Sequence, residues 1–385
     1  MSKRHVIPSK KKQFVFLIRS GTVGDQKPLA LLAVHAAYAI SQLENDTCPP
    51  VKVICEVWDI TKWYPCIEKF AKYLMGPDYT QWFQTEFRVT EPVTLQELKN
   101  SIVFKSTTFQ GEPRQNNVVF LDFGDNEESI NRFTSVALKI FRPDSMYFGS
   151  LYLPLDDNLS WSSEDAIEEL KSFCTKHSTT GKKIVTLAGS LTPPFDLQEL
   201  IDWQNQDQTN EWVILLIGYT RWIEFTHLGS KMNPAKMYAM KHYIQFEDLM
   251  RCTDFFVSNC GAGSVMIPFA AGCVQMCASR GQVGSDKTAN ETSVSEIYNV
   301  GPASYRGNKR LTFFEVMSDI QQNILTYEAN ASKAQALVSS ETSTAQWNLN
   351  QMFKDLCVNT SLRHRMLKSG FLPSQYSLTD ASESL

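Results

Sequence analysis

Short runs of apolar residues alternate along this chain with longer segments in which apolar residues recur at helical spacing. FVFLIRS (14–20) and VKVICEVWD (51–59) have the length and the β-branched and aromatic content of buried strands, and LALLAVHAAYAISQL (29–43) has the pattern of a helix. Further strands are expected at NVVFLDF (117–123) and SMYFGSLYL (145–153). Strands that alternate with helices in this way are typical of parallel α/β sheets.

A polar segment, LPLDDNLSWSSED (153–165), interrupts the alternation with a proline and several helix-capping residues. The pattern then restarts with a helix at 164–177 and strands at KKIVTLAGS (182–190), EWVILLIGY (211–219) and CTDFFVSNC (252–260). We therefore expect two successive α/β domains joined by an exposed linker. The expected divisions are a basic tail at 1–12, an N-terminal domain at 13–155, a C-terminal domain at 156–372 and a polar tail at 373–385.

Composition narrows the class of protein. A chain of 385 residues with 43% apolar and 20% charged residues is long enough for two buried cores. The net charge of -4 gives no basic field for nucleic acid, so no nucleic-acid partner is expected. The basic cluster in residues 1–12 is interpreted as a solvated tail, with nuclear targeting or peripheral contact with an anionic membrane left open. No apolar run reaches the ~18 residues of a membrane span, and we expect a cytoplasmic protein.

The nine cysteines are scattered, mostly within apolar segments, and form no Cys-x-x-Cys pair. They are interpreted as reduced core residues rather than disulfides or zinc ligands. The six histidines show no ligand spacing, so no metal site is expected. Because no Gly-x-Gly-x-x-Gly follows the first strand, a dinucleotide cofactor is not expected either.

Three glycine-bearing turns fall where a predicted strand meets a predicted helix: GTVGD (21–25), AGSLTP (188–193) and CGAGS (260–264). In open parallel sheets, ligands bind at the carboxyl ends of strands, where helix N-termini offer N–H donors to anions. The two glycines of the third turn would let the main chain approach a phosphate, and its serine could add a hydroxyl. Ordinary strand-to-helix turns are the alternative interpretation.

The order of these segments resembles nucleotide-sugar glycosyltransferases of the GT-B fold, and among them the sterol- and antibiotic-modifying UDP-glycosyltransferases. That family's donor domain has a strand ending in His-x-Gly-Ala-Gly-Thr, an Ala-Gly turn, a strand, Gly-Asp-Gln-x-x-Asn, Gly-Val-Gly-Pro and Leu-Thr. Residues 255–312 offer SNCGAGS, AAG, VQMC, GSDKTAN, NVGP and LT in the same order. GTVGDQKPLALLA (21–33) resembles the family's Gly-Thr-x-Gly-Asp-x-x-Pro loop, and 182–193 resembles the first strand and turn of its donor domain. Residues 58–115 are not covered.

The resemblance implies an α/β fold of two Rossmann-like domains facing each other across a cleft. It also implies a metal-independent, inverting hexosyltransferase that moves a sugar from a UDP-sugar to a hydroxyl of a small or lipid-like acceptor. The UDP-sugar is then a co-substrate, and no cofactor is needed. Asp25 is the expected general base, with capping of a helix at 27–43 as the alternative. Its neighbours in the expected acceptor loop are Gly21, Thr22 and Gly24.

In the same resemblance, a helix start at 261–264 would hold the departing diphosphate through its N–H groups. The implied donor contacts are Ser190, Asn259, Gly261, Ala262, Gly263, Ser264, Asp286, Lys287 and Asn290. Some of them have plainer alternatives: an N-cap for Ser264, a turn aspartate for Asp286 and a helix cap for Asn290.

Two of these positions depart from the family pattern. Asn259 stands where the family has His, and Lys287 stands where it has Gln. An amide can donate but cannot be protonated, whereas the lysine adds a cation. HYIQFEDLM (242–250) also lacks the family's usual uracil-contacting residues. The alternative function is therefore a catalytically silent relative that binds a nucleotide sugar or a protein partner, with a sugar epimerase as a third interpretation.

Overall fold

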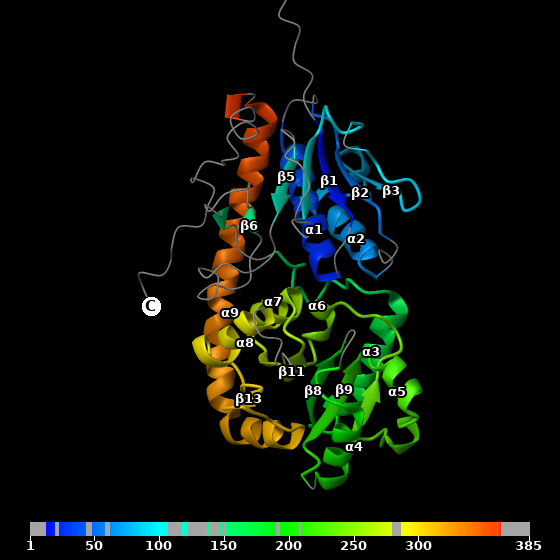
Figure 1. Ribbon diagram of the computed structural model, residues 1–385, viewed down its shortest axis with the longest axis vertical. Helices are drawn as coiled ribbons and strands as arrows, with labels where there is room; N and C mark the ends of the chain where they lie inside the picture. The colour runs from blue at the N-terminus through cyan, green and yellow to red at the C-terminus, as the bar shows by residue number, and fades with distance from the viewer. Residues whose placement is uncertain are drawn as a thin grey trace, which may run out of the picture. The chain divides into compact units, whose positions relative to one another are not determined.

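The computed structural model describes residues 13–19, 23–43, 48–57, 62–94, 96–106, 118–121, 137–138, 146–147, 151–189, 193–207, 209–278, 286–359 and 361–362. The chain forms two compact units. Unit 1 comprises Met1–Asp122, Val136–Phe148 and Thr344–Leu385, and unit 2 comprises Phe123–Ser135 and Gly149–Ser343. Each unit is built around its own parallel sheet, and both are shown in Figure 1.

Within the described residues, unit 1 holds a five-stranded parallel sheet in the order β3-β2-β1-β4-β5. Its strands are β1 (Phe14–Ile18), β2 (Val51–Cys55), β3 (Phe83–Phe87), β4 (Ile102–Ser106) and β5 (Val118–Leu121). The other elements of this unit are α1 (Val23–Ser41), α2 (Tyr64–Met75), η2 (Tyr79–Gln81), β6 (Ala137–Leu138) and β7 (Met146–Tyr147). All of β1 is buried, as expected of a central parallel strand covered on both faces.

Unit 2 repeats this arrangement with the order β10-β9-β8-β11-β12, again all parallel. Its strands are β8 (Lys183–Ala188), β9 (Trp212–Ile217), β10 (Met237–Ala239), β11 (Phe255–Ser258) and β12 (Val274–Cys277). Its helices are α3 (Glu164–Ser178), α4 (Leu197–Gln206), α5 (Thr220–Thr226), η4 (Gly229–Lys231), α6 (Phe246–Leu249), α7 (Ala262–Ala271), α8 (Asp286–Thr292) and η5 (Ser293–Ile297). A small hairpin, β13 (Tyr305–Arg306) and β14 (Lys309–Arg310), leads into α9 (Phe313–Val358). The predicted α/β class is confirmed, with one Rossmann-like strand order in each unit.

Helix α9 begins in unit 2 and returns the chain to unit 1. A capping box sets its start, because the Thr312 amide donates to Glu315 (2.8 Å) and the Glu315 amide donates to the Thr312 hydroxyl (3.2 Å). In unit 1 the ring of Phe353 packs edge-on against Phe14, with 5.7 Å between ring centroids. The same ring also contacts Phe16 and Phe104. The C-terminal turns of α9 thus complete the core of the first sheet, although residues 156–372 were predicted to form one C-terminal domain.

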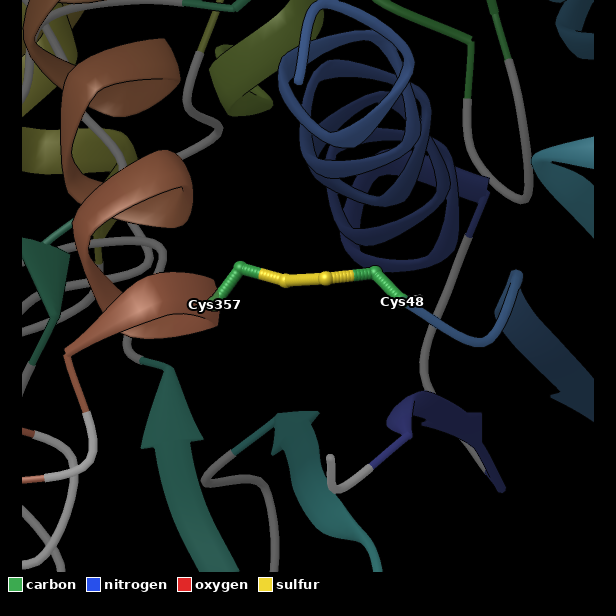
Figure 2. The surroundings of a disulfide bond; sticks show 2 residues. All are labelled: Cys48 and Cys357. Atoms are coloured by element: carbon green, nitrogen blue, oxygen red, sulfur yellow. A yellow bond between two sulfur atoms is a disulfide. The ribbon is translucent and has the colours of Figure 1, made fainter. Parts of the chain in front are cut away.

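A disulfide between Cys48 and Cys357 joins the segment before β2 to the last turn of α9, as Figure 2 shows. This bond corrects the prediction that all nine cysteines are reduced. All nine lie in described residues, and the other seven are free. Spacing could not reveal the pair, because the two sulfur atoms meet only when α9 returns to unit 1.

The segment 153–165, predicted to be an exposed linker, is partly buried, with Leu153, Trp161 and Ser162 at 0%, 3% and 5% exposure. Side chains of α6 hold it. Asp248 accepts hydrogen bonds from the amides of Trp161 (3.1 Å) and Ser162 (2.7 Å). Glu247 accepts one from the Leu153 amide (3.2 Å). Two buried carboxylates need such donors, and so they bind the segment to unit 2.

No helix among the described residues combines the length and the apolar character that a bilayer crossing requires. The described residues also contain no cluster of three or more His, Cys, Asp or Glu side chains suited to a metal ion.

Candidate functional site

The sheet of unit 2 has its switch point between β8 and β11, which are adjacent although β9 and β10 intervene in the sequence. Ala188 and Ser258, the last residues of these strands, are paired in register. The chain therefore leaves β8 and β11 at neighbouring points of the same sheet edge, where the glycine-bearing turns at 188–193 and 260–264 were predicted. Open α/β sheets bind ligands at this position. Ser190 itself lies outside the described residues.

Helix α7 starts at this edge without a side-chain cap. Gly261 is its N-cap residue, with φ -67° and ψ 148°. The N–H groups of the first turn cannot find partners inside the helix. Ser264 is therefore not the N-cap, which corrects one alternative for this residue. Its hydroxyl instead donates to the Gly261 carbonyl at 2.8 Å, so that it must rotate before it can donate to a ligand.

The glycines of this turn leave space rather than relieve backbone strain. A Cβ at Gly263 would meet no atom of the described residues within 4 Å, and one at Gly261 would meet only the Ser264 hydroxyl at 3.6 Å. Gly301 differs, because a Cβ there would collide with the backbone carbonyl of Gln275 in β12. Gly301 serves packing, whereas the main chain at the two turn glycines is left uncovered by the part of the chain that the structure describes.

The residue before α7 has an unusual backbone conformation. Cys260 is left-handed with φ 61°, which is uncommon for a residue with a Cβ. Its amide donates to the Ser258 hydroxyl at 3.3 Å, and its carbonyl accepts a hydrogen bond from Asn290 Nδ2 at 2.7 Å. Asn290 lies on α8 and is 5% exposed. The structure thus brings Asn290 to the turn, where its amide nitrogen binds main chain.

Lys287 lies one turn before Asn290 and is half-buried. Burial raises the pKa of the Cys260 thiol, the neighbouring Cys277 thiol and the charge of Glu291 raise it further, and the Lys287 ammonium lowers it. Lys287 and Glu291 are therefore both close enough to act on the turn electrostatically. Glu291 also accepts a hydrogen bond from the Ser304 amide at 3.2 Å. Helix α8 thus brings one cation and one anion within electrostatic range of the Cys260 side chain, next to the start of α7.

The other predicted donor contacts are described only in part. Asn259 follows the last residue of β11 and is half-buried. Ala262 and Asp286 are the first residues of α7 and α8, but their side chains lie outside the described residues. Asp286 is therefore a helix-start residue, and its predicted contact with sugar hydroxyls stays a prediction.

In unit 1 the corresponding switch point lies between β1 and β4. Helix α1, which follows β1, begins at Val23 rather than at residue 27, so Gly24 and Asp25 lie inside its first turn. Asp25 is therefore not the N-cap residue of this helix. Its side chain lies outside the described residues, as do Gly21 and Thr22. The helix dipole favours a carboxylate at this position.

The sequence did not predict two contacts near this turn. Gln26 Oε1 accepts a hydrogen bond from the Trp63 indole at 2.8 Å, and both side chains are buried. This bond fixes the first turn of α1 against α2. The Arg19 guanidinium pairs with Glu56 at 2.6 Å, where β1 and β2 end. The available signal for that pair was a single charged residue directly after each apolar strand.

No family profile matches the chain, and no curated protein matches it in sequence. Solved structures do share its fold. Os79 from O. sativa, in complex with UDP, superposes with a TM-score of 0.55 at 12% identity, covering 88% of this chain and 99% of that chain. UGT71G1 from Medicago truncatula, complexed with UDP-glucose, superposes with a TM-score of 0.51 at 10% identity, covering 90% of this chain and 99% of that chain.

At these identities the likeness defines the fold. The chain has the two Rossmann-like units of the GT-B fold found in UDP-glycosyltransferases, as the resemblance predicted. The closer likeness to sterol-modifying enzymes and the cleft between the domains stay predictions.

Proposed function

We propose that this protein is a metal-independent, inverting glycosyltransferase that moves a hexose from a UDP-sugar to a hydroxyl of a small or lipid-like acceptor. The observation that carries the proposal is the start of α7. It lies at the switch point of unit 2, it has no side-chain cap, and no described atom comes within 4 Å of a Cβ placed at Gly263. Lys287 on α8 acts electrostatically on the neighbouring Cys260, as does Glu291 with the opposite sign. The GT-B relatives above were solved with UDP or UDP-glucose, which supports a uridine nucleotide as the ligand.

Sugar transfer creates negative charge on the diphosphate as the bond to the anomeric carbon breaks. N–H groups at a helix start and a lysine cation stabilise that charge as it develops, so this chemistry does not require a metal ion. The acceptor oxygen forms the new bond from the opposite face of the sugar. The electron pair of the broken bond leaves with the diphosphate.

In the proposed reaction, Asp25 takes the proton of the attacking hydroxyl. A carboxylate in the first turn of a helix is held ionised by the dipole, so it starts the reaction ready to accept a proton. The hydrogen bond between Gln26 and Trp63 limits movement of this turn.

A catalytically silent nucleotide-sugar binder is the second candidate. Asn259 favours it, because an amide at the position of the family's His cannot carry a proton or a positive charge. The Ser264 hydroxyl is also engaged with the Gly261 carbonyl. Loss of one strong donor to the leaving group costs about 3 kcal/mol of transition-state stabilisation.

Calorimetry with UDP, followed by an assay of UDP release from UDP-sugars with and without hydroxyl acceptors, tests the proposal. We expect UDP to bind, and Asp25→Asn to bind UDP normally while losing release about 10²- to 10⁴-fold. Ser264→Ala is expected to weaken both binding and release. Asp165→Asn, which changes an exposed aspartate in the first turn of α3, is the matched control and should retain activity.

The outcomes separate the candidates. Saturable UDP binding without any release, in the wild type as in Asp25→Asn, would support the silent binder. No binding of any uridine nucleotide would overturn both.

A further inference from the structure

We infer that Asn290 is a positioning residue, which holds the turn before α7 in the one shape that directs its amide hydrogens toward a diphosphate. The inference rests on the proposed function, and it changes the role expected of Asn290 from contacting the donor to shaping the site. The hydrogen bond from Asn290 to the Cys260 carbonyl carries it.

The first step concerns the backbone of Cys260. A left-handed residue with a Cβ relaxes to a commoner conformation unless its surroundings hold it. Here two side chains hold it from opposite ends. Ser258 accepts from the Cys260 amide, and Asn290 donates to the Cys260 carbonyl from a buried position. Loss of the second bond frees the peptide that precedes Gly261.

The second step concerns the carbonyl oxygens of the turn. The Cys260 oxygen is engaged by Asn290, and the Gly261 oxygen accepts both the Ser264 hydroxyl at 2.8 Å and the Val265 amide at 3.1 Å. Carbonyl oxygens that accept hydrogen bonds within the protein are directed away from a ligand, and so they do not repel an anion. The groups left to face a ligand are the first-turn amides of α7, and an array of such amides binds phosphate oxygens.

The third step concerns the rigidity of the support. Asn290 sits on α8, and its neighbour Glu291 accepts a hydrogen bond from the Ser304 amide at 3.2 Å. Gly301 lies between Glu291 and Ser304 in the sequence, and its lack of a Cβ allows this segment to contact β12 closely. The Val300 carbonyl accepts from the Gln275 amide at 3.1 Å and completes this contact. Asn290 is therefore fixed to the same sheet that carries the turn.

The experiment compares the affinity for UDP with that for uridine, which lacks the diphosphate. Asn290→Asp keeps the shape of the side chain but replaces the donor with an oxygen that opposes the Cys260 carbonyl. Asn290→Ala is a second variant that removes the donor without adding charge. In both, we expect UDP affinity to fall at least about tenfold while uridine affinity stays within about twofold of wild type.

Asn330→Asp is the matched control. Asn330 Nδ2 also donates to the carbonyl of a left-handed residue, Asn299, at 3.0 Å, but from α9. This variant should leave both affinities unchanged. Thermal unfolding of the ligand-free proteins shows whether each variant is folded.

Three results would overturn the inference. They are UDP affinity unchanged in folded Asn290 variants, equal losses of UDP and uridine affinity, and a selective UDP loss in Asn330→Asp as well. If the wild-type protein binds no UDP, the proposed function fails first, and the inference fails with it.

Discussion

Cys48 and Cys357 lie 309 positions apart in the sequence and are joined by a disulfide within unit 1. Both side chains are largely buried, at 8% and 4% exposure. The bond ties the last turn of α9 to the segment that enters β2, close to where Phe353 packs against the sheet. The C-terminal turns of α9 are thus held to unit 1 by both a covalent bond and aromatic packing.

Removal of this disulfide should destabilise the protein. A cross-link of this kind typically contributes about 2–4 kcal/mol by restricting the unfolded chain. We expect Cys48→Ser, Cys357→Ser, or a reductant added to the wild type to lower the free energy of unfolding by about that amount. The double variant should no longer respond to reductant, and Cys174→Ser, at a half-exposed free cysteine, is the control.

A thiol titration of the denatured, unreduced protein should find seven reactive thiols, one for each free cysteine. Nine would contradict the disulfide. The same titration on protein taken directly from cells tests the predicted cytoplasmic location. Seven thiols there would argue against that location, because a reducing cytosol keeps thiols free.

Phe353→Ala should be strongly destabilising. The ring is fully buried among Phe14, Phe16 and Phe104, and truncation of such a ring costs about 3–5 kcal/mol. Trp347→Ala provides the contrast on the same part of α9, because Trp347 is 66% exposed and should change stability by less than about 0.5 kcal/mol. Urea unfolding of both variants checks the difference. Similar losses in the two would contradict the packing of α9 on this sheet.

The pH dependence of stability should report on His35. Burial lowers the pKa of this imidazole from 6.5 to about 4, and its Nδ1 has no hydrogen-bond partner among the described residues. Below pH 6.5 the unfolded chain therefore binds a proton at His35, whereas the folded protein binds it only as the pH approaches 4. The stabilisation by the neutral ring is complete above about pH 7 and is lost as the pH falls toward 4.

Urea unfolding between pH 7.5 and 4.5 measures this effect. The wild type should lose about 2–3 kcal/mol more over this range than His35→Leu does. His227→Asn, at an exposed histidine, is the control and should follow the wild type. Parallel pH profiles for the wild type and His35→Leu would show that His35 is not a buried neutral residue.

Two glycine substitutions should separate binding from folding. Gly263→Ala places a methyl group in space that no described atom occupies, so we expect unchanged stability but about tenfold weaker UDP binding. Gly301→Ala should do the reverse. Its Cβ would overlap the Gln275 carbonyl and cost about 1–3 kcal/mol of stability. Loss of stability in Gly263→Ala, or unchanged UDP affinity in the folded variant, would contradict the open turn.

Local pattern was sufficient for the elements whose signal is contained in a few consecutive residues. The strands β1 and β9 are continuous apolar runs, and β8 and β11 are mostly apolar, because both faces of a parallel sheet are covered. All four fall where the pattern predicted them. The helix at 164–177 was predicted from its capping residues, and Ser163 caps α3. Strand β3 was missed because it is an edge strand with one buried residue.

Part of the candidate site could be read from the sequence for the same reason. Glycines between a strand and a helix mark a backbone that stays open, and the start of α7 is such a place. The role of Asn290 could not be read in this way, because its partner is a carbonyl 30 residues away. The buried contacts of Leu153 and Trp161 could not be read from the sequence either, because their amides donate to carboxylates of α6, a distant part of the chain.

The sequence by itself determined the α/β class, most central strands and the glycine-lined helix start, since each depends on interactions between near neighbours in the chain. Only the tertiary structure decided the return of α9 to unit 1, the pairing of Cys48 with Cys357 and the bond from Asn290 to Cys260. These depend on which faces of distant elements meet, and apolar periodicity shows that a face is buried without showing what covers it.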